Sequence, residues 1–273
     1  MILTPEQPTL ALHARNAAES AHPELWRGLV GAWVPALGYQ GQRLLDLSSA
    51  RSHGDLVQGA AWTTGPEGLA IRYDNAALVD NIFGLPKWMS DWTVTGQIRA
   101  NDWNTSNRDG WFMLLDESGG RSIDFRAEDG NIAMGGSSGV GNHLLRDVSG
   151  ETGWHSVAYT QLASSTRVGF WDGFRYGTAS DMFNDPGDGA SIGGVSANAP
   201  FQSNSEKWFG DIGPVMLWDR VLTDSEILLV SFDPLAPFRL RDDTALATAA
   251  MFGGTPSVTI PPPLLNMQMT GSF

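Results

Sequence analysis

The segment GDIGPVMLWDRVLTDSEI, residues 210–227, runs from an apolar strand directly into a capped helix. Thr223 has the chemistry of an N-cap, and Glu226 follows three residues later, which is the spacing of a capping box. Leu222 and Ile227 fall at the N′ and N4 positions, where they can form a hydrophobic staple. One short helix at the close of the last strand, in a chain otherwise rich in strand patterns, predicts a two-sheet jelly roll.

Upstream of this segment the chain carries a series of short strand patterns separated by turn signals. The clearest pattern runs from Trp92 to Ala100, where alternate residues as far as Ile98 fall on one face. Asp172-Gly173 separates two aromatic runs, as a two-residue hairpin turn does. Roughly ten short strands spaced about 8–12 residues apart are typical of a sandwich or jelly roll. We expect strands at 28–34, 68–73, 92–100, 111–115, 121–127, 131–134, 154–161, 166–171, 174–176, 190–195 and 209–218.

The composition excludes several classes of function. The 273 residues include 32 glycines, 11 tryptophans and 12 phenylalanines, which suits many tight turns between aromatic-rich strands. Lys and Arg total 17 against 30 acidic residues, and the net charge of −13 predicts neither a nucleic-acid nor a membrane partner. Because the chain has no cysteine, disulfides, thiolate zinc sites and cysteine nucleophiles are excluded.

Composition divides the chain into three parts. Residues 1–25 form a polar, Ala-rich N-terminal arm, residues 26–231 carry nearly all the strand patterns, and residues 232–273 form an extended, Pro-rich tail. The first residues lack the basic start and apolar centre of a secretory signal peptide, and no apolar run is long enough to span a membrane. We therefore expect synthesis in a cytoplasm without export by a signal peptide.

The tail combines prolines with apolar residues. Three consecutive prolines at 261–263 favour polyproline II and cannot join a central strand. Leu, Met and Phe residues follow them, although solvated disordered tails are usually poor in such residues. An extended apolar segment is expected to lie on another surface. We predict assembly contacts at Pro261, Pro262, Pro263, Leu264, Leu265, Met267, Met269 and Phe273.

Five motifs, in order along residues 26–231, carry a resemblance to a known family. They are GLVGAW (28–33), LDLS with HGDL (45–48 and 53–56), GLAIRYD (68–74), GWHSVA (153–158) and DRVLTDSEI (219–227). Their order resembles the laminin-G-like family of the concanavalin A-like lectin and glucanase jelly rolls, although residues 49–51 depart from the family's Gly/Asn pattern. The resemblance implies an all-β, two-sheet antiparallel sandwich with one short helix after the last strand. It says little about the ligand.

Function is suggested by the segment DPLAPFR, residues 233–239, which resembles the tail that follows this domain in proteins of bacteriophages. The resemblance implies a non-enzymatic structural or decoration protein of the virion. The two arms would anchor it on other virion proteins and on copies of itself. The alternative is a carbohydrate-binding, lectin-like adhesion module that recognises cell-surface glycans. The two functions are compatible, because a particle component can also bind glycans.

Catalytic patterns are weak in this sequence. Glucanases of the resembled superfamily place carboxylates as Glu-x-Asp-x-Glu or Glu-x-Asp-x-x-Glu along one strand, and no such run occurs here. Asp124 and Glu128 can share a strand face, but Arg126 lies between them, and a solvated charged face explains the three residues better. We expect no enzymatic activity, and a glycoside hydrolase is the least favoured alternative.

Calcium is the one cofactor that the resemblance suggests, since many relatives bind it in loops at one edge of the sandwich. Asp74, Asn75, Asp80, Asn81 and Asp102 supply the hard oxygen ligands that calcium takes. The same residue types also close turns through their own side chains. A calcium site and ordinary turn chemistry both remain open for these residues.

Four tryptophans are candidates for stacking on sugar rings. Trp92 and Trp111 lie in strand patterns, so we expect them in the core. Trp88 and Trp103 lie in expected loops, which makes them the candidates for exposed ligand contacts.

Overall fold

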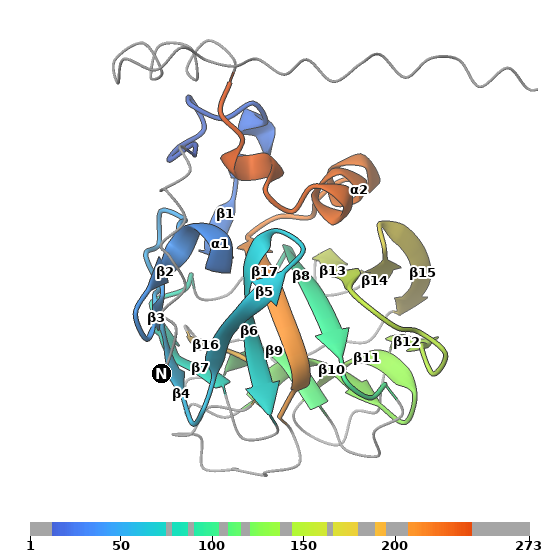
Figure 1. Ribbon diagram of the computed structural model, residues 1–273. Coiled ribbons are helices and arrows are strands. Elements are labelled where there is room, and N and C mark those ends of the chain that lie inside the picture. Colours follow the sequence, from blue (N-terminus) through green and yellow to red (C-terminus); the bar gives the residue numbers. More distant parts are fainter. Residues whose placement is uncertain are drawn as a thin grey trace, which may run out of the picture.

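Two antiparallel β-sheets stack face to face in the computed structural model of this chain (Figure 1). The structure describes residues 13–74, 78–86, 90–103, 109–115, 121–136, 144–162, 166–179, 189–194 and 207–241. Short antiparallel strands dominate these residues, which confirms the prediction of an all-β, two-sheet sandwich. Every helix within these ranges is too short or too polar to cross a membrane.

One sheet has eight strands. They are β1 (Leu29–Trp33), β5 (Ala61–Gly65), β6 (Gly68–Asp74), β8 (Trp92–Ala100), β13 (His155–Leu162), β14 (Thr166–Trp171), β15 (Phe174–Ala179) and β17 (Phe209–Trp218). Seven of them pair in the order β15-β14-β13-β8-β17-β6-β5, and β1 lies off this path and pairs with β17. The long strand β17 pairs with β6 near its start and with β1 near its end, and these pairings hold the first and last strands of the domain together.

The other sheet has nine strands. They are β2 (Tyr39–Gln40), β3 (Arg43–Leu44), β4 (Gly54–Val57), β7 (Leu78–Phe83), β9 (Asp109–Leu115), β10 (Arg121–Glu128), β11 (Asn131–Gly136), β12 (Leu144–Asp147) and β16 (Gly189–Ile192). Their order is β12-β11-β10-β9-β16-β7-β4-β3-β2. Every strand expected from the sequence is present, and the structure adds β2 to β5, β7 and β12.

Short helices surround the sandwich: η1 (Pro23–Trp26), α1 (Pro35–Gly38), α2 (Asp224–Phe232) and η3 (Ala236–Phe238). The predicted capping box begins α2. Thr223 Oγ1 accepts a hydrogen bond from the Glu226 N–H at 3.3 Å, and Glu226 Oε2 accepts one from the Thr223 N–H at 2.8 Å. Leu222 and Ile227 are both buried, as the predicted staple requires. The expected link from the last strand to a capped helix is therefore confirmed.

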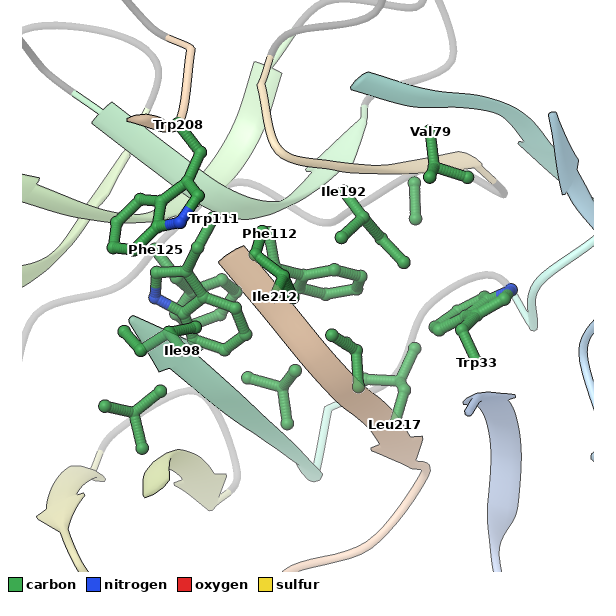
Figure 2. Packing of buried hydrophobic residues seen from close by; sticks show 14 of the residues in the cluster. Trp33, Val79, Ile98, Trp111, Phe112, Phe125, Ile192, Trp208, Ile212 and Leu217 are labelled. Carbon is green, nitrogen blue, oxygen red and sulfur yellow. The ribbon is translucent and has the colours of Figure 1, made fainter. Parts of the chain in front are cut away.

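The main hydrophobic core lies between the two sheets. Figure 2 shows side chains of both sheets meeting in this layer, among them Ile98, Trp111, Phe112, Ile212 and Leu217.

Gly96 makes room for a tryptophan in this core. Trp111 lies at a register shift between β9 and β10, and both it and the next residue, Phe112, reach the core. A Cβ atom at position 96 would lie 2.5 Å from the Trp111 ring, far inside van der Waals contact. Trp92 and Trp111 are fully buried, which confirms the expectation that they are core residues.

A second hydrophobic cluster covers part of the outer face of the eight-stranded sheet. Leu25 of η1, Ile227 of α2 and Phe238 of η3 belong to this cluster together with Met216 and Trp218 of β17. Figure 1 shows α2, in orange, on this side of the molecule close to β13.

The described part of the expected N-terminal arm is packed on the domain. The Ala14 N–H donates to the Phe238 carbonyl at 2.9 Å, and Ser20 and Leu240 form an antiparallel bridge. This corrects the expectation that residues 13–25 lie outside the core, because the segment after α2 supplies backbone partners for them. The three-part division itself stays a prediction. Residues 1–12 and 242–273, with all the expected assembly contacts from Pro261 to Phe273, lie outside the described residues.

Candidate functional site

A row of charged and aromatic side chains crosses the outer face of the eight-stranded sheet beyond the second cluster. Asp211 of β17 pairs in register with Arg72 of β6 on one side and with Arg99 of β8 on the other. His155 pairs with Ile98, so the residue before it, Trp154, continues the row next to Arg99. Because residues opposite each other share a face, the sheet aligns Arg72, Asp211, Arg99 and Trp154.

The carboxylate of Asp211 is buried beneath the two guanidinium groups. Arg72 donates from Nε to Oδ1 at 2.9 Å and from Nη2 to Oδ2 at 3.2 Å, and Arg99 donates from Nη2 to Oδ2. The Asp211 side chain is fully buried, whereas those of Arg72 and Arg99 are 53% and 34% exposed. Paired hydrogen bonds of this kind compensate the cost of burying a carboxylate. The face that meets solvent is therefore made of the arginines.

Trp154 lies over small residues of the sheet. A Cβ atom at Gly213 of β17 would be 3.6 Å from the Trp154 ring, and one at Gly65 of β5 would be 3.5 Å from it. The Arg99 guanidinium carbon is 5.4 Å from the ring centroid, within the range of a cation–π contact. The half-buried indole is thus held between the sheet and a charged neighbour.

On one side of Trp154 is a cleft of about 610 Å³, which we name the polar cleft. It is lined by residues 99–103, at the end of β8, and by residues 149–153, in the loop before β13. Asn101 and Asp102 are exposed, and Arg99 forms part of the wall. Hydrogen-bond donors and acceptors therefore alternate around this cleft.

On the other side of Trp154 is a cleft of about 420 Å³, which we name the aromatic cleft. Phe174 of β15 and Phe232 of α2 line it with Trp154, and these two phenylalanines are 65% and 71% exposed. Polar groups share the wall, namely Gln97, His155, Ser156, Asp172 and Ser231. Exposed aromatic rings beside a few polar groups are typical of binding surfaces.

His155 lies in the wall of the aromatic cleft and is held by several contacts. Its Nδ1 is 2.9 Å from Asp172 Oδ2, and its ring stacks on Trp171 with centroids 4.5 Å apart. Burial alone lowers the pKa of His155, but the hydrogen bond that its ring donates to Asp172 and the negative charges of Asp172 and Glu151 outweigh burial and raise the pKa above 6.5. The pKa of Asp172 is lowered, since the contacts with His155 and the Ser156 N–H outweigh its burial.

This pair is expected to make stability depend on pH. Because the pKa of His155 is raised in the folded protein, its ion pair adds to the free energy of unfolding. This stabilisation is complete below pH 6.5 and is lost as the pH rises through the pKa of His155 in the folded protein. Because the pKa of Asp172 is lowered in the folded protein, Asp172 also stabilises the fold. This stabilisation is present above pH 3.8 and is lost as the pH falls through the pKa of Asp172 in the folded protein. Because Asp172 is partly exposed, the effect is about 0.5–1 kcal/mol.

An NMR titration of the His155 ring measures its pKa, and urea unfolding at several pH values measures how stability depends on pH. In Asp172→Asn we expect the His155 pKa to fall below 6.5, because burial would then dominate. A His155 pKa that does not change in this variant would contradict the assignment.

Of the two sequence-based candidates for sugar contacts, Trp103 borders the polar cleft but is not exposed as expected. The Trp103 side chain is only 4% exposed, and its ring contacts Trp171 and Trp208 at centroid distances of 5.6 and 5.9 Å. The expectation of an exposed Trp103 is therefore wrong, because distant aromatic residues close over this loop. Trp88 lies outside the described residues.

The calcium candidates are distributed over both sheets. Asp74 ends β6 and is exposed, Asp102 lines the polar cleft, and Asp80 and Asn81 lie in β7 of the nine-stranded sheet. Asn75 lies outside the described residues. Within the described part of the chain no three His, Asp or Glu residues are grouped as a metal site would require. Calcium binding stays a prediction.

Contrary to the sequence-based prediction, the ion pair of Arg126 and Glu128 is not on a solvated face of its strand. Arg126 is buried and forms an ion pair with Glu128 at 3.0 Å, so the expectation of a solvated face is wrong at this position. Sequence reasoning also missed Arg99 and Trp154. The alternation of β8, which places Gln97 and Arg99 opposite the buried face, is the signal that points to Arg99.

No protein-family model and no curated protein matches the chain, but solved structures do. The binding domain of Paraclostridial Mosquitocidal Protein 1 is 14% identical with a TM-score of 0.55, over 75% of this chain and 52% of that one. Domain 4 of the extracellular arabinanase AbnA of Geobacillus stearothermophilus, solved with arabinotriose, is 14% identical with a TM-score of 0.54, over 74% of this chain and 98% of that domain.

A sialidase of Trypanosoma rangeli, solved with sialic acid, is 14% identical with a TM-score of 0.57, over 76% of this chain and 33% of that one. The chain thus spans about half the length of the mosquitocidal binding domain and a third of the sialidase. At these identities the likeness is one of fold alone. The chain has the β-sandwich fold that these binding domains and glycosidases contain.

Proposed function

We propose that this chain is a non-catalytic, carbohydrate-binding module whose site is the aromatic cleft and the adjoining polar cleft. The observation that carries the proposal is the exposure of Phe174 and Phe232 beside the half-buried Trp154. The C–H faces of a sugar ring pack on aromatic rings, and its hydroxyl groups need donors and acceptors nearby. Gln97, Ser156 and the residues of the polar cleft offer both. The fold is also one used by binding domains and by an arabinanase domain solved with arabinotriose.

The carboxylates around the clefts support binding better than hydrolysis. Retaining glycosidases need two carboxyl groups about 5–5.5 Å apart, one of them protonated at working pH. Asp172 is engaged by His155 and its pKa is lowered, which removes it as a general acid. Glu151 accepts a hydrogen bond from Arg146 at 3.3 Å. Both carboxylates thus hold neighbouring side chains in place.

The role in a virion, with virion proteins as partners, stays a separate prediction. It depends on residues 233–239 and on the apolar tail, of which residues 242–273 lie outside the described part. The segment 236–240 contacts residues 14–21 of the same chain, so it is engaged within the domain. A carbohydrate-binding module is compatible with display on a particle.

The test is a glycan array followed by calorimetry on the best ligand, with and without calcium. We expect wild-type binding, and Trp154→Ala and Phe174→Ala should each weaken it by about 10- to 100-fold, since aromatic anchors dominate such sites. Phe83→Ala is the matched control, because Phe83 is 52% exposed but lies in β7 of the other sheet. The proposal fails if no glycan binds, or if the Phe83 variant loses as much affinity as the other two.

A further inference from the structure

We infer that the glycan bound at this site is acidic, and that its carboxylate is bound by Arg99 and Arg72. The inference rests on the proposed function and adds the chemical class of the ligand. It starts from the row Arg72, Asp211, Arg99 and Trp154, in which the Arg99 guanidinium lies beside the Trp154 ring and Arg72 lies on the other side of Asp211.

Neutralising Asp211 does not require both arginines. Arg72 alone contacts both carboxylate oxygens, with Nε at 2.9 Å from Oδ1 and Nη2 at 3.2 Å from Oδ2. Arg99 adds a second positive charge to a carboxylate that is already paired. The row thus carries a net charge of +1, although the whole chain carries −13. One guanidinium already balances the charge of the buried carboxylate, so the second one leaves a positive charge on the face that meets solvent.

The free donors of the two guanidinium groups point to an anion. Each guanidinium has five N–H donors, and within the described residues Asp211 takes two from Arg72 and one from Arg99. Asp211 holds both groups on the sheet, which limits the conformational freedom that they would lose on binding. A carboxylate matches the fork of such a guanidinium in charge and shape.

The positive charge of Arg99 lies within reach of a sugar ring that rests on Trp154. Arg99 lies 5.4 Å from the Trp154 ring centroid and lines the polar cleft, so a ring resting at Trp154 would bring a carboxylate substituent to Arg99. Asp102 and Glu151 line the same cleft. Glu151 is paired with Arg146, and the negative charge of Asp102 is expected to oppose an anionic ligand in this cleft.

The experiment compares an oligosaccharide that contains a uronic acid, its methyl ester and the neutral parent sugar by calorimetry. The ester keeps the ring and removes the charge. We expect the acid to bind about tenfold or more tightly than the ester, with an advantage that shrinks as salt is raised. Arg99→Gln and Arg72→Gln should each reduce this advantage to less than about threefold. Asp102→Asn should increase the advantage of the acid over the ester.

Melting temperatures show whether each variant is folded, and Arg99→Lys, which keeps the charge, should keep part of the advantage. Equal binding of acid and ester by the wild type would overturn the inference and leave the proposed function standing. So would an advantage that survives both arginine variants, or acetate that binds as tightly as the acidic oligosaccharide. If neither acidic nor neutral glycans bind, the proposed function itself fails.

Discussion

Replacing Asp46 by alanine is expected to lower the free energy of unfolding by about 3–5 kcal/mol. The carboxylate is fully buried and accepts hydrogen bonds from the N–H groups of Ala32, Ser48 and Ser52, each at 2.8 Å. The Ser48 hydroxyl donates a fourth, also at 2.8 Å. Alanine would leave three backbone donors buried without this acceptor, and each costs about 1–3 kcal/mol. Urea unfolding of the variant measures the loss.

Two further variants show that the hydrogen bonds are the cause. Asp46→Asn should also destabilise strongly, because its NH₂ group would face a donor where Asp46 presents an acceptor to Ser52 or Ala32. Ser48→Ala removes the hydroxyl donor to Asp46 and the acceptor for the Ala50 N–H at 3.2 Å, and it should cost about 1 kcal/mol. Similar stabilities of Asp46→Ala and the wild type would refute the assignment of Asp46 as the centre of this loop.

Trp218→Ala is the second substitution with a large expected effect, a loss of about 3–5 kcal/mol. The ring is fully buried in the second cluster, and its Nε1–H donates to the Leu25 carbonyl at 2.7 Å. Removing the ring leaves a cavity under α2 and breaks a link between β17 and the N-terminal segment. We expect faster amide hydrogen exchange in residues 20–27 in addition to the loss of stability.

Trp218→Phe separates these two effects. It keeps most of the buried volume and removes the hydrogen bond, so it should cost clearly less than the alanine variant. Phe232→Ala serves as the control, because Phe232 ends the neighbouring helix but is exposed, and its stability should stay within about 0.5 kcal/mol of wild type. Unchanged hydrogen exchange at residues 20–27 in Trp218→Ala would contradict the proposed link.

The strand set and the capped helix could be predicted because their signals are local. A capping box joins residues three apart, and strand alternation or a two-residue turn lies within a few residues of sequence. The Asp172-Gly173 turn has positive φ at both residues, as its sequence predicts. The strands that were missed are short or lack alternation, such as β2 and β3 with two residues each.

The role of Asp46 could not be predicted from the sequence, although the motif that contains it was recognised. The LDLS motif marked a resemblance, but one of the backbone donors to Asp46 comes from Ala32, in β1, 14 residues away. The burial of Trp103 could not be predicted from the sequence either, because the rings that cover it, Trp171 and Trp208, come from distant parts of the chain. Local patterns place a residue in a loop; they do not say what packs over that loop.

By itself, the sequence determined the all-β sandwich, most of its longer strands and the helix that begins after Thr223, since short-range chemistry specifies each of them. Only the tertiary structure decided which side chains lie together on the outer face of the eight-stranded sheet. Arg72, Asp211 and Arg99 are far apart in sequence, and register across three neighbouring strands brings them together. Their alignment beside Trp154 is a property of the sheet, because cross-strand pairing sets which side chains become neighbours.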